Sequence, residues 1–198
     1  DLRPQSKPQR KLAFLELFKL PGFIAVVVVG ALVQASHGAL YAIGTLHWLN
    51  TGISESVIGL LWAQGVVAEV MLFAFGFWLM RKMGVRGLLW LAVVGGSIRW
   101  IVMGFPIDIA GLFGLQMLHA FTFAATHLAM TQYITHKVPD QLTASAQTFY
   151  DALAMGAFMG VTMTLAGIFY NVMEGQVFWL MALLSIAAGL VLGRSNSN

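Results

Sequence analysis

The sequence has no cysteine and little charge. The absence of cysteine among its 198 residues excludes disulfides and thiolate metal sites, but it leaves the compartment undecided. Charged residues make up 10% of the chain, against roughly 25% in ordinary soluble domains. Hydrophobic residues make up 59%, and the mean hydropathy is +0.80. This composition excludes an ordinary soluble domain and predicts an integral membrane protein.

The sequence is rich in long apolar runs. They recur along nearly the whole chain, each with about the 20 residues that a helix needs to cross a bilayer. We expect an all-α fold, because backbone polar groups in lipid must be satisfied within their own segment, and the ten-residue alternation of a membrane barrel is missing. A transmembrane bundle over 21–194 is predicted, followed by a tail at 195–198. Its six helices are expected at about 22–49, 54–80, 87–105, 109–135, 143–171 and 176–193.

Lysine and arginine gather in alternate connections. They precede the first helix and follow the second, fourth and sixth helices, whereas the intervening loops have none. By the positive-inside rule, both ends of this segment are cytoplasmic. Residues 1–20, DLRPQSKPQRKLAFLELFKL, are expected to form a cytoplasmic linker with a short amphipathic helix. The start without methionine suggests part of the central loop of a longer chain, although a cloning boundary would look the same.

Two ionisable residues lie deep in the predicted helices. Arg99 and Glu69 are at comparable depth in the third and second helices, where a charge costs roughly 2.5–3.5 kcal/mol. We expect the two side chains to face each other in one cavity. Arg99 would keep Glu69 ionised there until a proton or an anionic substrate competes for the contact. The alternative is a structural ion pair that fixes helix packing.

Polar residues form stripes on two other helices. A neutral His119 near the middle of the fourth helix suits a bond to a substrate hydroxyl or a proton relay. His37 and Tyr41 on the first helix suit an aromatic wall with a polar tip, and Trp62 lies on a similar face to Glu69. The full stripes are Gln116, His119, Thr122, Phe123, Thr126 and His127 on the fourth helix, and Gln34, His37, Tyr41, Gly44 or Thr45, and Trp48 on the first.

Several functions are disfavoured by the same residues. A zinc site is not expected, because His119 and His127 lie about 12 Å apart and no carboxylate shares their helix. Asp151 lies near the cytoplasmic side of the fifth helix, where solvation of the helix end and a gating contact are equally good explanations. No nucleophile–base pair or metal cluster is visible, so we expect neither an enzyme nor a cofactor.

The loop after the second helix contains Gly76 and then RKMGVRG. It resembles the Gly-x-x-x-Asp-Arg-x-Gly-Arg-Lys loop of the major facilitator superfamily of transporters, with Lys82, Gly84 and Arg86 in place and Arg81 where the aspartate would be. Within the superfamily, residues 20–193 are similar to the bacterial 3-phenylpropionate permease group, relatives of lactose permease. The stretches that carry this likeness are LWAQGVVAEVMLFA (61–74), SIRWIVMG (97–104), LQMLHAFTFAATHLA (115–129), LAGIFY (165–170) and VFWLMAL (177–183).

The resemblance implies roles for individual residues. Arg99 and His119 match an arginine and a histidine that serve proton coupling and substrate binding in lactose permease. Glu69 lies about one turn from the substrate-binding glutamate of lactose permease, at the place where the phenylpropionate group has its glutamate. Thr122 and Gln116 stand where lactose permease has its proton-carrying glutamate and a lysine. Sugar specificity therefore does not carry over, and coupling is expected to depend on Glu69.

The resulting hypothesis is that the chain is the C-terminal half of a proton-coupled secondary transporter in a bacterial inner membrane. The transporter would import a small aromatic carboxylate by alternating access. Its partners would be the substrate, protons, the bilayer and an N-terminal six-helix half, without nucleic acid. The alternatives are a nucleoside or sugar symporter, or a self-sufficient six-helix homodimer or scaffold. The expected residues are Arg99, His37, Tyr41, Trp62, Gln34 and Gln116 for substrate binding, Glu69, His119 and Arg99 for proton coupling, and Asp151, Lys82 and Arg86 for gating.

Overall fold

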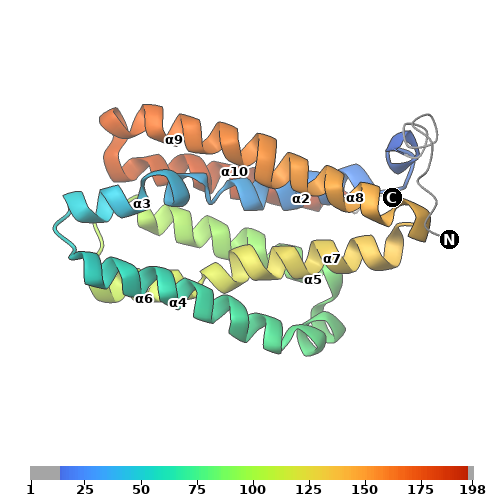
Figure 1. Ribbon diagram of the computed structural model, residues 1–198, viewed down its shortest axis with the longest axis horizontal. Helices are drawn as coiled ribbons and strands as arrows, with labels where there is room; N and C mark the ends of the chain where they lie inside the picture. The colour runs from blue at the N-terminus through green and yellow to red at the C-terminus, as the bar shows by residue number, and fades with distance from the viewer. Residues whose placement is uncertain (1–13, 196–198) are drawn as a thin grey trace.

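The structure, a computed structural model that describes residues 14–195, is all-helical over that range (Figure 1), which confirms the predicted fold class. Two helices, α2 and α3, make the first crossing, and the later crossings follow in chain order. The elements are α2 (Phe23–Ala35), α3 (Gly38–Asn50), α4 (Glu55–Ala74), α5 (Gly76–Met103), α6 (Ile109–Met117), the π-helical segment η1 (Ala120–Ala124), α7 (Ala125–Lys137), α8 (Asp140–Asp151), the π-helical segment η2 (Ala152–Phe158), α9 (Met159–Met173), the short turn η3 (Glu174–Val177) and α10 (Phe178–Arg194).

Five described stretches are long and apolar enough to cross a membrane. They are Phe23–Asn50, Glu55–Ala74, Gly76–Met103, Ile109–Lys137 and Asp140–Arg194. The last has 55 residues and contains two crossings, because the chain turns back at η3 and α10 then runs opposite to α9 (Figure 1). Both of the last two predicted helices are therefore present.

The helix boundaries differ from the prediction in three places. The first crossing is broken at Ser36 and His37, between α2 and α3. The second crossing continues through Phe75, whose backbone oxygen accepts from the N–H of Leu79 at 3.0 Å. The chain turns at Gly84, inside the predicted loop at 81–86, where a φ of 64° is a left-handed value that favours glycine. The fourth and fifth crossings each contain a π-helical stretch, which inserts an extra residue into the turn and which a 3.6-residue pattern does not reveal.

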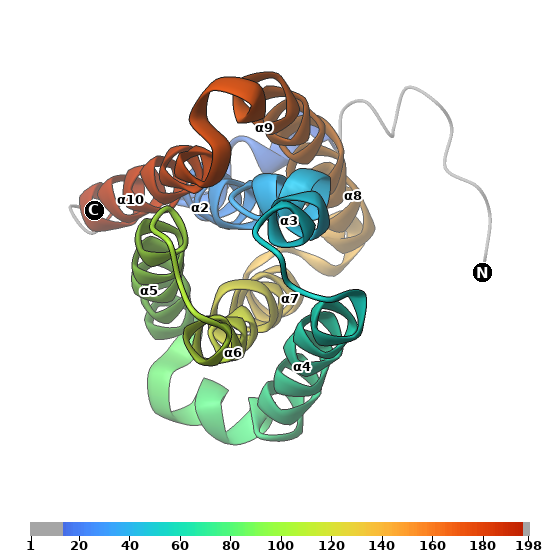
Figure 2. The ribbon, with the colours of Figure 1, turned by 90° about the vertical axis from the view of Figure 1, so that its left-hand side faces the viewer.

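The end view in Figure 2 shows that the first and fourth crossings lie inside the bundle, between the other crossings. The first crossing (α2 and α3) lies between α10 and α9, and the fourth (α6 to α7) lies between α5 and α4. The segments with basic residues, which are the turn at 81–86, the α7–α8 turn and the end of α10, all lie at one end of the bundle (Figure 1). This arrangement agrees with the charge pattern from which the orientation is predicted.

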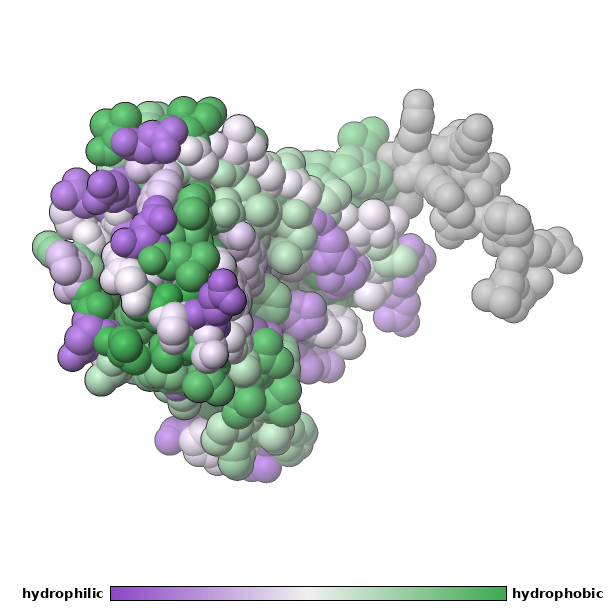
Figure 3. Space-filling model, turned by 60° about the vertical axis from the view of Figure 1, so that its left-hand side comes forward, coloured by the Kyte–Doolittle hydropathy of each residue, from purple (hydrophilic) through white to green (hydrophobic). Residues whose placement is uncertain are grey.

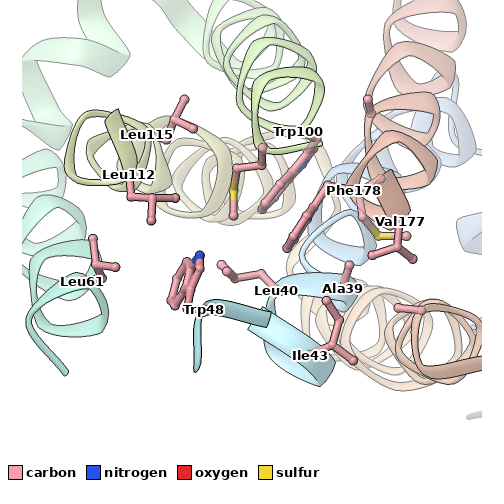
Figure 4. Close-up of a cluster of buried hydrophobic side chains, with 14 of the residues drawn as sticks. Ala39, Leu40, Ile43, Trp48, Leu61, Trp100, Leu112, Leu115, Val177 and Phe178 are labelled. Carbon is pink, nitrogen blue, oxygen red and sulfur yellow. The ribbon is translucent and has the colours of Figure 1, made fainter. Parts of the chain in front are cut away.

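Buried apolar clusters hold the bundle together, and apolar side chains also cover much of its surface. In the cluster of Figure 4, Trp100 of α5 stacks on Phe178 of α10 with ring centroids 6.1 Å apart. On the outside, Phe77 and Val172 are 79% and 86% exposed, and Figure 3 shows hydrophobic residues spread among hydrophilic ones on one face. A soluble protein would not expose so many large apolar side chains, whereas lipid solvates them.

Candidate functional site

Arg99 is fully buried and lies at the centre of a polar network between α5 and the fourth crossing. Its Nη1 donates to Nδ1 of His119 at 2.9 Å and to Oγ1 of Thr122 at 3.2 Å. Its Nη2 donates to Oε1 of Gln116 at 2.5 Å. The guanidinium carbon lies 4.5 Å from the ring centre of Trp100. These contacts offset the cost of burying the charge, since charge-assisted hydrogen bonds and an indole face both favour a cation.

Two glycines allow α5 to come close enough for these contacts. A Cβ atom on Gly95 would lie 3.3 Å from Cβ of Phe121 in η1, and one on Gly96 would lie 2.7 Å from Oγ of Ser185 in α10. Glycine at both positions therefore lets the backbone of α5 approach its neighbours on both sides. The result is that Arg99, one turn further along, reaches the polar face of the fourth crossing.

The contacts of His119 determine where its proton lies. An arginine only donates hydrogen bonds, so Nδ1 of His119 must accept, and its proton must be on Nε2. Nε2 then donates to Oε1 of Glu69 at 2.7 Å. Arg99 and Glu69 are thus joined through the imidazole, which corrects the expectation that the two charges face each other directly.

A second histidine continues the network toward the break in the first crossing. Nδ1 of the fully buried His37 lies 3.0 Å from the backbone oxygen of Gln34 and 3.2 Å from that of Val33, and these oxygens are acceptors, so Nδ1 carries the proton. Nε2 of His37 therefore accepts from the hydroxyl of Thr122, at 2.9 Å. Because both ring nitrogens are engaged, His37 ties the end of α2 to η1.

A cavity of about 130 Å³ lies next to Glu69. Tyr41 and Trp62 form one wall, with ring centroids 6.0 Å apart and ring planes 23° from parallel, and Nε1 of Trp62 donates to Oγ1 of Thr45 at 3.0 Å. At Gly65 a Cβ atom would meet Cδ2 of His119 at 3.4 Å, so glycine keeps this space open. The lining consists of Leu40, Tyr41, Trp62, Gly65, Val66, Glu69, Gln116 and His119.

The structure brings most of the predicted substrate-binding residues together, but not all of them line the cavity. Arg99 and His37 lie behind it, and Gln34, which donates to the backbone oxygen of Phe123 at 3.5 Å, lies outside the lining. The amide of Gln116 is engaged at both ends, because its Nε2 also donates to the backbone oxygen of Leu61 at 3.1 Å. In this conformation the cavity therefore offers Glu69, His119 and the aromatic wall to a ligand.

The three predicted gating residues each have a different partner. Asp151 is exposed and accepts from Nε2 of Gln147 at 3.0 Å. Lys82 lies over the ring of Trp78 at 5.0 Å. Arg86 donates to the backbone oxygen of Leu192 at 2.8 Å, which ties α5 to the end of α10. None of the three contacts another of the set in this conformation.

Two structural residues of the site were not anticipated. Nε1 of Trp100 donates to Oγ of Ser36 at 2.8 Å, so the indole beside Arg99 is fixed at the break of the first crossing. Only the position of Trp100 directly after Arg99 could have indicated this. Over residues 14–195, no group of three histidine, cysteine, aspartate or glutamate side chains is arranged to hold a metal ion.

Comparison with known proteins agrees with this architecture. The model of the MFS_1 like family matches residues 3–181. A protein of Escherichia coli (strain K12) named "Probable 3-phenylpropionic acid transporter" is 36% identical over 166 residues, which cover 84% of this chain and 43% of that protein. The "Uncharacterized transporter YwbF" of Bacillus subtilis (strain 168) is 27% identical over 190 residues, which cover 94% of this chain and 47% of that protein.

These matches confirm the resemblance seen in the sequence. The chain spans less than half the length of either curated relative. No solved structure matches it significantly. Because the family model covers most of the chain, and the more similar relative aligns along 84% of it, the chain belongs to the MFS_1 like family of major facilitator transporters.

Proposed function

We propose that this chain forms the C-terminal half of a proton-coupled secondary transporter that imports a small aromatic carboxylate, such as a phenylpropionate-like acid. The observation that carries the proposal is the cavity in which Glu69, bonded to His119, lies beside the aromatic wall of Tyr41 and Trp62. The name of the E. coli relative supports the substrate class. An N-terminal half as partner, a bacterial inner membrane and cytoplasmic ends belong to the same proposal, and the basic residues at one end of the bundle support the orientation.

Glu69 is the proton carrier in this mechanism. His119 already accepts at Nδ1 and donates from Nε2, so it cannot take a second proton without losing its contact with Arg99. A protonated Glu69, in contrast, still accepts through its carbonyl oxygen, so it takes up a proton while the network stays in place. Its side chain is 18% exposed, which gives a proton access from the cavity.

The substrate would bind after the proton. An ionised Glu69 repels a second carboxylate inside a cavity of about 130 Å³. Protonation of Glu69 removes this repulsion and makes its carboxyl group a hydrogen-bond donor. The protonated group can then donate to an oxygen of the substrate carboxylate. The stacked rings of Tyr41 and Trp62 offer an apolar face to the substrate ring. Arg99, fully buried, acts through His119 in this conformation rather than by touching the substrate.

The other candidate functions have less support. A nucleoside or sugar needs free groups that bond hydroxyls, but the Gln116 amide and the His37 ring are each engaged at both ends. A scaffold gives no reason for a buried charge network that ends at a cavity. We therefore propose neither.

Uptake of radiolabelled 3-phenylpropionate by proteoliposomes containing the complete protein encoded by the gene tests the proposal. Glu69→Gln should abolish uptake driven by an imposed pH gradient, because an amide carries no proton, and should retain exchange of substrate across the membrane, because glutamine resembles the protonated acid. Arg99→Ala should abolish both, since His119 loses the donor that fixes its proton.

Glu55→Gln is the matched control, because Glu55 lies on the same helix as Glu69 but at its exposed start. This variant should take up substrate like the wild type. Uptake that stays gradient-driven in both Glu69→Gln and Arg99→Ala would refute the mechanism.

A further inference from the structure

A larger cavity, of about 410 Å³, lies at the end of the bundle opposite the turn at Gly84. We call it the outer cavity. It is enclosed by the end of α3, the connection from Met103 to Ile107, the start of α6 and the turn η3. Its walls include the aromatic side chains Trp48, Phe105 and Phe178. The outer cavity shares no lining residue with the cavity beside Glu69, so the transport mechanism gives it no role.

Trp48 gives this cavity a hydrogen-bond donor. The side chain is only 2% exposed, yet its indole N–H donates to no acceptor within residues 14–195. The indoles of Trp62, Trp100 and Trp179 all have acceptors, namely Oγ1 of Thr45, Oγ of Ser36 and the backbone oxygen of Ile101. The Trp48 nitrogen is not one of the enclosed polar atoms that lack a partner, so it is open to the cavity, and an indole N–H in a largely buried ring usually finds an acceptor. Figure 4 shows the Trp48 nitrogen at the ring edge that faces the space between Leu112 and Leu40, and Leu112 is another residue of the lining.

The charged residue at the outer cavity limits which ligands suit it. Glu174 is exposed, and its backbone has a φ of 47°, a strained value for a residue other than glycine. His47 is fixed beside it, with Nδ1 3.3 Å from the hydroxyl of Tyr170 and its ring against Gly175, where a Cβ atom would lie 2.9 Å from Cε1. An anion entering past Glu174 is repelled, whereas a neutral molecule is not.

We propose that the outer cavity binds a small neutral aromatic molecule with an oxygen acceptor, which the indole N–H of Trp48 holds. The aromatic side chains of the lining pack against the ring of the ligand, and the oxygen of the ligand gives Trp48 the missing partner. Trp48 also contacts Trp62 of the cavity beside Glu69, with ring centroids 6.1 Å apart, so a ligand here touches one member of an indole pair that links the two cavities. This inference stands apart from the proposed function, because the ligand is defined by the outer cavity alone.

The test uses the complete protein in nanodiscs, labelled with 5-fluorotryptophan and observed by fluorine NMR. The Trp48 signal is identified by its loss in Trp48→Phe, and the probes are 3-phenylpropanamide and 3-phenylpropionate. We expect the amide to shift the Trp48 signal to saturation and to bind more tightly than the acid. In Trp48→Phe, calorimetry should show amide affinity reduced about threefold to tenfold, the value of one neutral hydrogen bond. Trp90→Phe, at an exposed indole on α5, is the control and should bind the amide like the wild type.

Two further variants separate the sites and keep the test decisive if Trp48→Phe does not fold. Thr51→Trp, at an exposed position in the lining of the outer cavity, should fill that cavity and abolish the shift of the Trp48 signal on addition of the amide, called here the Trp48 response. Gly65→Leu should fill the cavity beside Glu69 and leave that response intact. The proposal is overturned if neither probe moves the Trp48 signal, if Thr51→Trp leaves the response unchanged, or if Gly65→Leu removes it. Absence of gradient-driven uptake by the wild-type protein, with an intact Trp48 response, would instead count against the proposed function alone.

Discussion

Replacing Thr122 with valine tests the network around Arg99 with little change of shape. The buried hydroxyl of Thr122 accepts from Arg99 at 3.2 Å and donates to Nε2 of His37 at 2.9 Å. Valine leaves the His37 nitrogen buried without a donor, which costs about 1–3 kcal/mol. Arg99 loses one acceptor, but its Nη1 still donates to His119, so the free-energy cost at Arg99 is smaller than the cost at His37. Burial of the new methyl group offsets about 0.8 kcal/mol.

The net expectation is a loss of about 2 kcal/mol in the free energy of unfolding, or roughly 30-fold in the unfolding equilibrium. Reversible unfolding in mixed detergent micelles measures this difference. The matched control is Thr164→Val, because Thr164 is exposed and bonds only to the backbone oxygen of Gly160 in its own helix, at 2.8 Å. Its change should stay within about 0.5 kcal/mol.

The two variants also give a clear refutation. If Thr122→Val changes the free energy of unfolding no more than Thr164→Val does, the hydroxyl does not join Arg99 to His37 in the membrane. Proton-driven uptake should survive in Thr122→Val, because the contact between Glu69 and His119 does not include the hydroxyl. A stable Thr122→Val protein without coupling would contradict the assignment of Glu69 as the proton carrier.

Two further substitutions test the packing around the site. Gly96→Ala should lower the free energy of unfolding by about 1–3 kcal/mol, because its Cβ would lie 2.7 Å from Oγ of Ser185, whereas Gly167→Ala has open space and should be neutral or slightly stabilising. Ser36→Ala should cost about 1–3 kcal/mol by removing the acceptor of the Trp100 indole, and Ser97→Ala, whose hydroxyl bonds only to Val93 in the same helix, should cost less. Thermal denaturation of the purified variants, each beside its control, measures both differences.

The sequence is enough to predict the fold class and to single out the polar residues inside the helices. Apolar runs of sufficient length specify helices, and Arg99 and Glu69 stand out because charge is rare inside them. The spacing of Gln116, His119 and Thr122 also predicts that they share a face, and in the structure all three bond to Arg99. Helical periodicity within one segment is a local property, so the sequence reports it directly.

The pairing between helices was not predictable in the same way. Whether Arg99 meets Glu69 or His119 first depends on the rotation and separation of three helices, which the close contacts at Gly65 and Gly96 help to set. The π-helical turns and the break at His37 also change which side chains face inward, and no local pattern marks them. The expected direct contact of Arg99 with Glu69 was wrong for this reason.

The histidine between the two charges separates two requirements that a direct ion pair would combine. A buried arginine needs acceptors away from water, and Arg99 finds them in His119, Thr122 and Gln116. The proposed proton carrier needs access to the cavity, and Glu69 has it because the imidazole spans the gap to Arg99. If Glu69 contacted Arg99 directly, the carboxylate would lie in the fully buried part of the network, where a proton could reach it only by breaking the pair. With His119 in between, Glu69 can gain or lose its proton while Arg99 keeps all its partners.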